Sequence, residues 1–203
     1  MKNYLYINGN KVELTEEQIA KMAEVGIYEE EKKTVIDNVK TVMIGKHEFI
    51  VLNRNEENGT VELLLKGFLG EETFGSDCDY KKSNVKKVID KFQKEIEGII
   101  GTDSFVEYTL DLTADDGLKD YGEIKTKMSL LTCDMYRKYV EQIDEYKLDK
   151  WWWLATPWST PKHGYETTVL CVSPRGILNY NGCFYNICGV RPFCILKSCI
   201  FNA

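Results

Sequence analysis

The chain of 203 residues lacks any apolar run that could cross a bilayer, which requires about 20 residues. Its first residues also lack the apolar stretch of a secretory signal peptide. We therefore expect synthesis in the cytoplasm and no insertion into a membrane. Thiols stay reduced in that compartment, so we do not expect the odd set of seven cysteines to form a disulfide framework.

An excess of positive charge is also missing. The 26 Lys and Arg residues against 32 Asp and Glu residues give a formal net charge of -6. The overall field therefore disfavours nucleic acids and anionic membranes as partners. Hydrophobic residues nevertheless make up 43% of the chain and aromatic residues 12%. That is enough apolar side chain for the core of one domain with a small appendage.

The sequence shows no clear catalytic or metal-binding group. One acidic stretch superficially resembles a calcium loop, and it contains Asp111, Asp115, Asp116 and Gly117. Leu112 and Ala114 occupy positions where an EF-hand needs ligands, so the register fails. His47 and His163 are far apart in the sequence, and no nucleophile elbow is present. We therefore expect no metal, no cofactor and no catalytic residue.

The first 35 residues are expected to form a small appendage. Residues 3–14 alternate in the manner of a β-hairpin, with Asn8-Gly9 in the turn. Thr15 begins a capping box and predicts a helix over about residues 16–25. A segment of this size cannot bury a core of its own. We expect it to be an appendage or an element for homo-oligomerisation, and residues 36–203 to form the main domain.

The main domain is expected to have an α+β fold with short mixed strands, two main helices and long loops. The expected strands cover residues 39–44, 47–52, 60–65, 105–112, 151–155, 167–173, 176–180 and 190–196. Ser83 is expected to cap a helix over residues 84–99. Its inward apolar positions would be Val85, Val88, Ile89, Phe92, Ile96 and Ile99. Thr132 is expected to cap a second helix over residues 133–146.

The C-terminal part contains two dense apolar segments, residues 151–157 and 189–197, with the uncharged segment 178–188 between them. The middle segment is rich in Tyr and Asn, which supply contact area and adaptable hydrogen bonds at low entropic cost. The pattern predicts a recognition surface on a rigid frame. We expect Trp151–Leu154 and Val190–Leu196 to be buried, adjacent strands of one sheet.

The residues expected to contact a ligand lie in and beside the middle segment. They are Asn179, Tyr180, Asn181, Phe184, Tyr185, Asn186 and Ile187, with Trp158 and His163 at the edge. Tyr180, Phe184, Tyr185 and Asn186 should be exposed on one face together with Trp158. Arg191 is expected to have a structural role, in which its fork of donors holds a buried carboxylate or loop carbonyl groups.

Four short segments together resemble a known family. They are Met128–Thr132, Tyr136–Tyr139, the Trp-Trp-Trp-Leu-Ala-Thr-Pro segment that ends at Pro157, and the Gly-Val-Arg-Pro segment that ends at Pro192. The family is an uncharacterised bacterial and phage domain with a Trp-Trp-Leu-Arg-(Ser/Thr)-Pro-Gly motif and a closing Gly-Val-Arg-Pro motif. The resemblance covers roughly residues 36–203 and departs from the usual Arg-Ser-Pro-Gly at Ala155 to Trp158.

That family resembles the C-type lectin fold, in the branch shared with formylglycine-generating enzyme and the variable proteins of diversity-generating retroelements. The resemblance implies a phage- or prophage-encoded, virion-associated protein that displays a diversified surface to a protein or cell-surface receptor. Retroelement mutagenesis turns Asn codons ending in C into codons that cannot encode Lys, Glu, Gln, Met or Trp. Residues 163–189 contain one residue of these types, Glu166. A buried segment would also exclude long charged residues, so both explanations stay open.

Two other functions remain open. Cys183 and Cys188 have the C-x4-C spacing of the catalytic cysteine pair in formylglycine-generating enzyme, which the resemblance extends to a thiol-dependent oxidoreductase. Zinc is not expected, because the spacings that continue to Cys194 and Cys199 lack C-x2-C knuckles. The third alternative is a structural virion protein that assembles through its first 35 residues.

Overall fold

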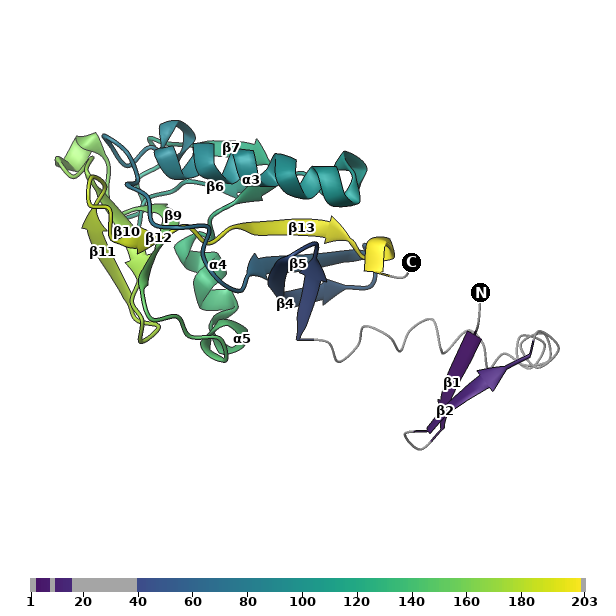
Figure 1. Ribbon diagram of the computed structural model, residues 1–203. Coiled ribbons are helices and arrows are strands. Elements are labelled where there is room, and N and C mark those ends of the chain that lie inside the picture. The colour runs from purple at the N-terminus through teal and green to yellow at the C-terminus, as the bar shows by residue number, and fades with distance from the viewer. Residues whose placement is uncertain (1–2, 8–9, 16–39, 202–203) are drawn as a thin grey trace. The chain divides into compact units, whose positions relative to one another are not determined.

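The computed structural model describes residues 3–7, 10–15 and 40–201. The chain divides into two compact units, Met1–Val39 with Phe201–Ala203, and Lys40–Ile200. In the first unit, β1 (Asn3–Ile7) and β2 (Asn10–Leu14) form the predicted antiparallel hairpin (Figure 1). The predicted Asn8-Gly9 turn, the predicted helix over residues 16–25 and the boundary after residue 35 lie outside the described residues.

The larger unit is built on a five-stranded antiparallel sheet with the strand order β3-β4-β5-β13-β8. The strands are β3 (Thr41–Ile44), β4 (His47–Asn55), β5 (Thr60–Leu65), β13 (Phe193–Lys197) and β8 (Met128–Ser129). β3, β4 and β5 follow one another in the chain, each paired antiparallel with the next, and they lie where the sequence predicted three strands. The last strand of the chain, β13, lies beside β5 in the middle of the sheet (Figure 1).

The helix α3 (Asn84–Ile100) packs on one face of this sheet. Its N-cap Ser83 accepts a hydrogen bond from the Lys86 N–H, as the capping pattern predicts. The Phe92 ring of the helix stacks on Phe49 of β4, with centroids 6.3 Å apart. Ile99 was expected to face inward but is 49% exposed, because it lies in the last turn of α3 at the border of the core. Its Cδ1 lies over Gly45, where an added Cβ would come within 2.9 Å of it.

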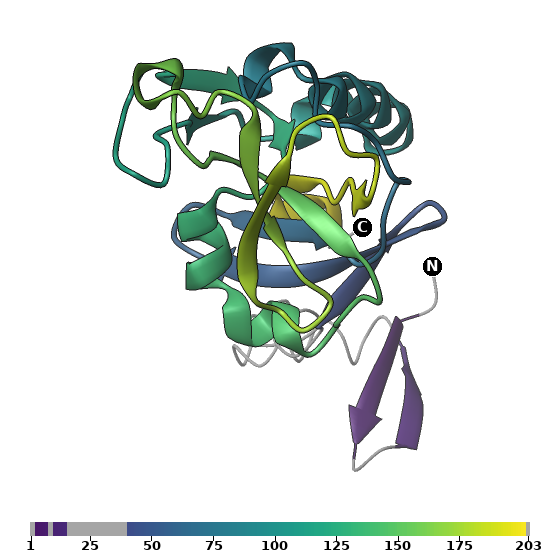
Figure 2. The ribbon, with the colours of Figure 1, turned by 90° about the vertical axis from the view of Figure 1, so that its left-hand side faces the viewer.

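A four-stranded sheet with the order β11-β10-β9-β12 lies at one end of the five-stranded sheet (Figures 1 and 2). Its strands are β9 (Trp151–Pro157), β10 (Thr168–Val172), β11 (Leu178–Gly182) and β12 (Cys188–Gly189). The smaller elements are η1 (Tyr80–Lys82), η2 (Thr102–Ser104), the hairpin of β6 (Tyr108–Asp111) and β7 (Glu123–Thr126), η3 (Pro161–His163) and η4 (Ser198–Phe201). The architecture is α+β, as predicted, and no helix of the described residues is long and apolar enough to span a bilayer.

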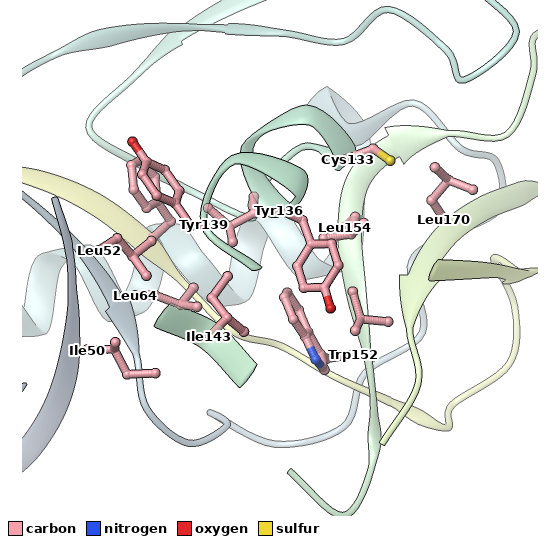
Figure 3. Close-up of a cluster of buried hydrophobic side chains, with 13 residues drawn as sticks. Ile50, Leu52, Leu64, Cys133, Tyr136, Tyr139, Ile143, Trp152, Leu154 and Leu170 are labelled. Carbon is pink, nitrogen blue, oxygen red and sulfur yellow. The ribbon is translucent and has the colours of Figure 1, made fainter. Parts of the chain in front are cut away.

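A buried cluster fills the space between the two sheets and two short helices (Figure 3). Alternation along β4 places Phe49 toward α3 and Ile50 and Leu52 toward this cluster. Its other members include Leu64, Tyr136, Tyr139, Ile143, Trp152, Leu154, Leu170, Val172 and Phe193. The four-stranded sheet is thus held by the same core as the larger sheet.

The predicted helix over residues 133–146 is two helices, α4 (Cys133–Lys138) and α5 (Val140–Asp144). Thr132 caps the first as predicted. The chain leaves helical geometry at Tyr139, where φ is -113° and ψ is 15°. The buried Tyr139 donates its hydroxyl hydrogen bond to Glu62 on β5. This tertiary bond holds the side chain at the break, and the helical period of the sequence carries no sign of it.

The two end motifs are buried, but the expectation that they form adjacent strands of one sheet is wrong. β9 belongs to the four-stranded sheet and β13 to the five-stranded sheet. The closing motif itself is divided between them. Gly189 pairs with Trp152, the chain then crosses over at Val190–Pro192, and Phe193 joins β5 opposite Leu64. The Gly-Val-Arg-Pro motif is therefore the joint between the two sheets of one compact unit.

Candidate functional site

The predicted contact segment forms the outer strand of the four-stranded sheet. β11 pairs with β10, where Tyr180 lies opposite Leu170 and Gly182 opposite Thr168. Side chains alternate along a strand, so Tyr180 and Gly182 share one face of the sheet. The opposite edge of β11 has no neighbouring strand in the described structure. β11 is therefore the edge strand of this sheet.

The loop that follows β11 is fixed at both ends. Cys183 is fully buried, and its N–H donates to the Thr167 carbonyl oxygen at 2.8 Å. Cys188 is also fully buried, and its carbonyl oxygen accepts a hydrogen bond of 3.3 Å from the Glu72 N–H. All four residues between them, 184–187, are exposed. The C-x4-C spacing thus places two buried anchors around an exposed loop.

Most of the predicted contact residues are exposed. The exposed fractions are 54% for Tyr180, 57% for Phe184, 51% for Tyr185 and 48% for Ile187. Asn179, Asn186 and His163 are exposed as well, whereas Asn181 and Trp158 are half-buried. The expected exposure of Tyr180, Phe184, Tyr185 and Asn186 is confirmed. Large apolar groups that gather in water are more frequent at contact surfaces than elsewhere on a protein.

Gly182 allows two aromatic rings to lie on the face of β11 that carries Tyr180. An ideal Cβ at Gly182 would come within 3.0 Å of the Tyr185 ring and within 3.1 Å of the Phe184 ring. The two rings contact each other, with centroids 4.8 Å apart. A side chain at position 182 would therefore displace both rings from this face.

Trp158, the residue directly after β9, contacts the ring of Tyr180. Its N–H donates to the Thr168 carbonyl oxygen at 2.9 Å, which fixes the backbone next to β10. Its ring contacts Tyr180, with centroids 4.5 Å apart, and packs in part against the buried cluster. We call Trp158, Tyr180, Phe184 and Tyr185 the aromatic surface. The expected cluster with Trp158 is confirmed at its contact with Tyr180.

The side chains of the two asparagines of β11 accept hydrogen bonds from backbone N–H groups of the same strand. The alternation of the β10–β11 ladder leaves the N–H groups of Tyr180 and Gly182 directed to the free edge. The Asn179 side-chain oxygen accepts from the Tyr180 N–H at 2.8 Å, and the Asn181 oxygen accepts from the Gly182 N–H at 3.0 Å. Both amides thus shield donors through which an edge strand would pair with another chain. Contact area for a ligand comes mainly from the aromatic rings.

His163 is part of a polar group next to Trp158. Its Nδ1 lies 2.9 Å from Asp116 Oδ2, and the buried Ser159 hydroxyl donates to the same oxygen at 2.5 Å. The hydrogen bonds from Ser159 and His163 lower the pKa of Asp116. The serine bonds to the aspartate and not to the histidine, so this order does not activate a nucleophile. The group instead ties the loop after Trp158 to the loop that contains Asp116.

The two anchor thiols are poor nucleophiles. Burial raises the pKa of Cys183 to about 11. The neighbouring Cys171 thiol and burial raise the pKa of Cys188 far above its ordinary value. Only a thiolate attacks or binds metal well, so both groups are protonated at neutral pH. Within the described ranges, no three His, Cys, Asp or Glu side chains lie close enough together to hold a metal ion.

A polar pocket of about 240 Å³ lies between the loop after β6 and the start of α4. Arg137 donates to Asp134 at 2.9 Å and lies 3.5 Å from Asp115. Asp111 accepts two hydrogen bonds from Thr113, which lower the pKa of the Asp111 carboxyl group. The charged groups of this pocket already satisfy one another, so it is a weaker candidate than the aromatic surface.

Sequence reasoning missed two exposed apolar residues near this surface in the chain, Tyr165 and Ile177. Ile177 follows Gly176 in the turn before β11, where φ of the glycine is 80°. An apolar residue in a turn is the signal that could have identified it. With these two, six of the eight exposed large hydrophobic residues among the described residues lie between 165 and 187.

One comparison with known proteins gives a match. The model of the family described as a domain of unknown function, DUF6273, matches residues 25–198. No curated protein and no solved structure matches the chain.

Proposed function

The chain belongs to the DUF6273 family, and we propose that it is a non-enzymatic binding protein that contacts a protein or cell-surface receptor through the aromatic surface. The observation that carries the proposal is the concentration of exposed large apolar side chains in residues 165–187. Such side chains cost free energy in water and are rare in contiguous patches unless they contact a partner. Aromatic side chains are also the residues that contribute most to binding at interfaces.

The chemistry of the surface indicates the kind of partner. Residues 176–190 contain no Asp, Glu, Lys or Arg. Recognition would therefore rest on apolar contact and on hydrogen bonds to Asn179, Asn186 and the Tyr180 and Tyr185 hydroxyl groups. A partner with an apolar or aromatic patch of its own fits these groups better than a strongly charged partner.

The finer assignment is a C-type-lectin-like domain encoded by a phage or prophage, whose recognition segment is diversified by a retroelement. Asn, Tyr, Phe and Ile make up most of the exposed segment, and each of them has a codon that ends in C, as the proposed mutagenesis requires. Cys183 and Cys188 remain in the core while residues 184–187 face water. Side chains in this loop can therefore change without opening a cavity in the core.

Two alternatives have less support. A thiol-dependent oxidoreductase would need a reachable thiolate, whereas Cys183 and Cys188 are buried and their pKa values are raised. Assembly into a virion through the first 35 residues concerns a segment of which the described part is a two-stranded hairpin. Such an assembly role is compatible with receptor binding by the larger unit.

The test uses a triple variant, Tyr180→Ser with Phe184→Ser and Tyr185→Ser. The matched control is Met43→Ser with Ile99→Ser, which removes exposed apolar side chains from β3 and α3. Binding of the labelled proteins to intact cells of the source bacterium is measured against total protein. We expect the wild-type chain and the control to bind alike, and the triple variant to lose binding.

Equal binding by the triple variant and the wild-type chain would contradict the proposal. A parallel test for the finer assignment is the DNA sequence around the gene. A near-repeat of the coding region for residues 163–189, next to a reverse transcriptase gene, would support diversification. A genome without either would remove the retroelement part and leave the binding proposal in place.

A further inference from the structure

The last two residues of β11 are Asn181 and Gly182, and they form an Asn-Gly pair on an edge strand. The Gly182 N–H is directed away from β10, to the free edge of the sheet. There it donates a hydrogen bond of 3.0 Å to Oδ1 of Asn181. The backbone nitrogen of the glycine is therefore held beside the side-chain amide of the residue before it.

Such a pair can react within the chain without an enzyme, a cofactor or an oxidant. Hydroxide removes the proton of the backbone N–H, and the nitrogen attacks Cγ of the asparagine. The new N–Cγ bond closes a succinimide ring, while the Cγ–Nδ2 bond breaks and Nδ2 takes up a proton from water and leaves as ammonia. Water then hydrolyses either ring C–N bond, which gives aspartate or isoaspartate in place of asparagine.

The position of the pair in β11 favours this reaction. The Gly182 nitrogen lies 3.0 Å from Oδ1 of Asn181, an atom bonded to Cγ, so the reacting groups are already adjacent. Gly182 has no side chain to obstruct ring closure, and it allows the backbone rotation that closure requires. Gly182 is also the last residue of the strand and pairs with Thr168, the first residue of β10. The end of an edge strand opens at little cost in free energy.

Asn179 provides a comparison within the same strand. Its Oδ1 accepts from the Tyr180 N–H at 2.8 Å, so its reacting groups are as close as those of Asn181. The side chain of Tyr180, however, crowds the nitrogen that would attack. Asn179 also lies opposite Cys171, inside the β10–β11 ladder. We expect Asn179 to keep its amide.

Asn58 and Gly59 form the other Asn-Gly pair in the described part of the chain. In this turn between β4 and β5, the Gly59 N–H donates to the Glu56 carbonyl oxygen at 3.3 Å and not to the side chain of Asn58. Among the described residues, only Asn181 combines a following glycine with a hydrogen bond from that glycine to its own amide oxygen.

We propose that Asn181 is a modification site, at which the folded chain deamidates spontaneously through attack by the Gly182 nitrogen. Both products place a negative charge in residues 176–190, which contain no charged side chain. Isoaspartate also lengthens the main chain by one carbon directly before Gly182. The Tyr185 and Phe184 rings lie close to Gly182, within 3.1 Å of an added Cβ, so the lengthened chain displaces them. The modification therefore alters the aromatic surface as the protein ages. This consequence for binding rests on the function proposed above, whereas the modification itself does not.

The test follows the wild-type chain during incubation in mildly alkaline buffer, both folded and unfolded in urea. Peptide mapping by mass spectrometry measures the loss of each amide, and chromatography separates the aspartate and isoaspartate products. We expect Asn181 to be converted in the folded chain at a rate within about tenfold of that in urea, because the strand end opens readily. Asn179 should keep its amide in the folded chain. A slower conversion of Asn181 than this range, or equal conversion of Asn179, would overturn the proposal.

Hydroxylamine gives a second readout, because it cleaves the chain at a succinimide. Added to the folded wild-type chain, it should produce fragments 1–181 and 182–203. The matched variant is Asn181→Gln, which keeps an amide but would have to close a larger, less favourable ring, and it should give neither fragment. Absence of these fragments from the wild-type chain would show that no succinimide forms at Asn181. Neither readout requires a receptor, so a failure of the cell-binding test and a failure of this proposal are distinguishable.

Discussion

The anchor role of Cys183 predicts an unusual order of effects between two substitutions. Sγ of this residue is fully buried, and no other described residue forms a hydrogen bond with it. Cys183→Ala removes one sulfur, which is comparable in size to a methylene group. The lost transfer free energy of the sulfur and the small cavity together should lower the free energy of unfolding by about 1–2 kcal/mol. Cys183→Ser nearly keeps the size but buries a hydroxyl group without a partner, which costs about 1–3 kcal/mol. Serine should therefore destabilise at least as much as alanine.

Urea unfolding at equilibrium measures both variants, with an unchanged slope m as the check that only stability has changed. The matched control is Cys199→Ser, because Cys199 is the one cysteine of the described residues that is exposed. The control should lie within about 0.5 kcal/mol of the wild-type chain, as surface substitutions usually do. A Cys183→Ser protein of wild-type stability that loses an oxidase activity would refute the anchor reasoning and favour the thiol enzyme.

Three further predictions concern the frame, pH and salt. Trp153→Ala should cost about 3–5 kcal/mol in urea unfolding, because its ring is fully buried. Asp116 has a lowered pKa, so its contribution to stability is present above the ordinary value of 3.8 and is lost as pH falls through the lowered folded value. Acid titration of Asp116→Asn should lack this loss, and an unchanged acid profile would contradict it. Receptor affinity should hardly change between low and high salt, since residues 176–190 are uncharged; a steep decline measured in a salt series would argue against apolar recognition.

Local patterns predicted the parts of the fold that depend on neighbouring residues. The alternation of β4 and the helical period of α3 are visible in the sequence because one face of each element meets the core. The caps Ser83 and Thr132 act through the first turn of their own helices. These contacts are short-range, and the sequence records them directly.

Long-range contacts explain what the sequence could not predict. β12 has two residues, and its existence depends on parallel pairing with Trp151 and Trp152. The break at Tyr139 depends on Glu62, which is 77 positions away. The closing motif has the pattern of one apolar strand, yet the chain passes from one sheet to the other at Arg191. The guanidinium group of Arg191 donates a hydrogen bond to the carbonyl oxygen of Leu65, the last residue of β5, and this bond holds the crossing in place. No local propensity contains these partners.

The candidate site also has features that the sequence predicted and features that depend on long-range contacts. Exposure of Tyr180 and Phe184 followed from an uncharged, Asn- and Tyr-rich segment between apolar strands, which is a compositional signal. The anchor role of Cys183 and the ring-accommodating role of Gly182 did not follow, because each depends on how the chain folds back after β11. The C-x4-C spacing indicated a redox pair by resemblance, whereas the two thiols are each buried at a different end of the exposed loop.

This arrangement explains how the proposed binding surface can be apolar on an edge strand without favouring uncontrolled strand pairing. An exposed edge with large apolar groups is a template for another strand. Here Asn179 and Asn181 bond the two outward N–H groups, so strand addition would first have to break both bonds. The rings on the face remain free, while the buried cysteines hold the loop ends. The anchors thus stabilise the loop and the asparagines protect the edge, which leaves the exposed aromatic side chains free for the proposed contact with a partner.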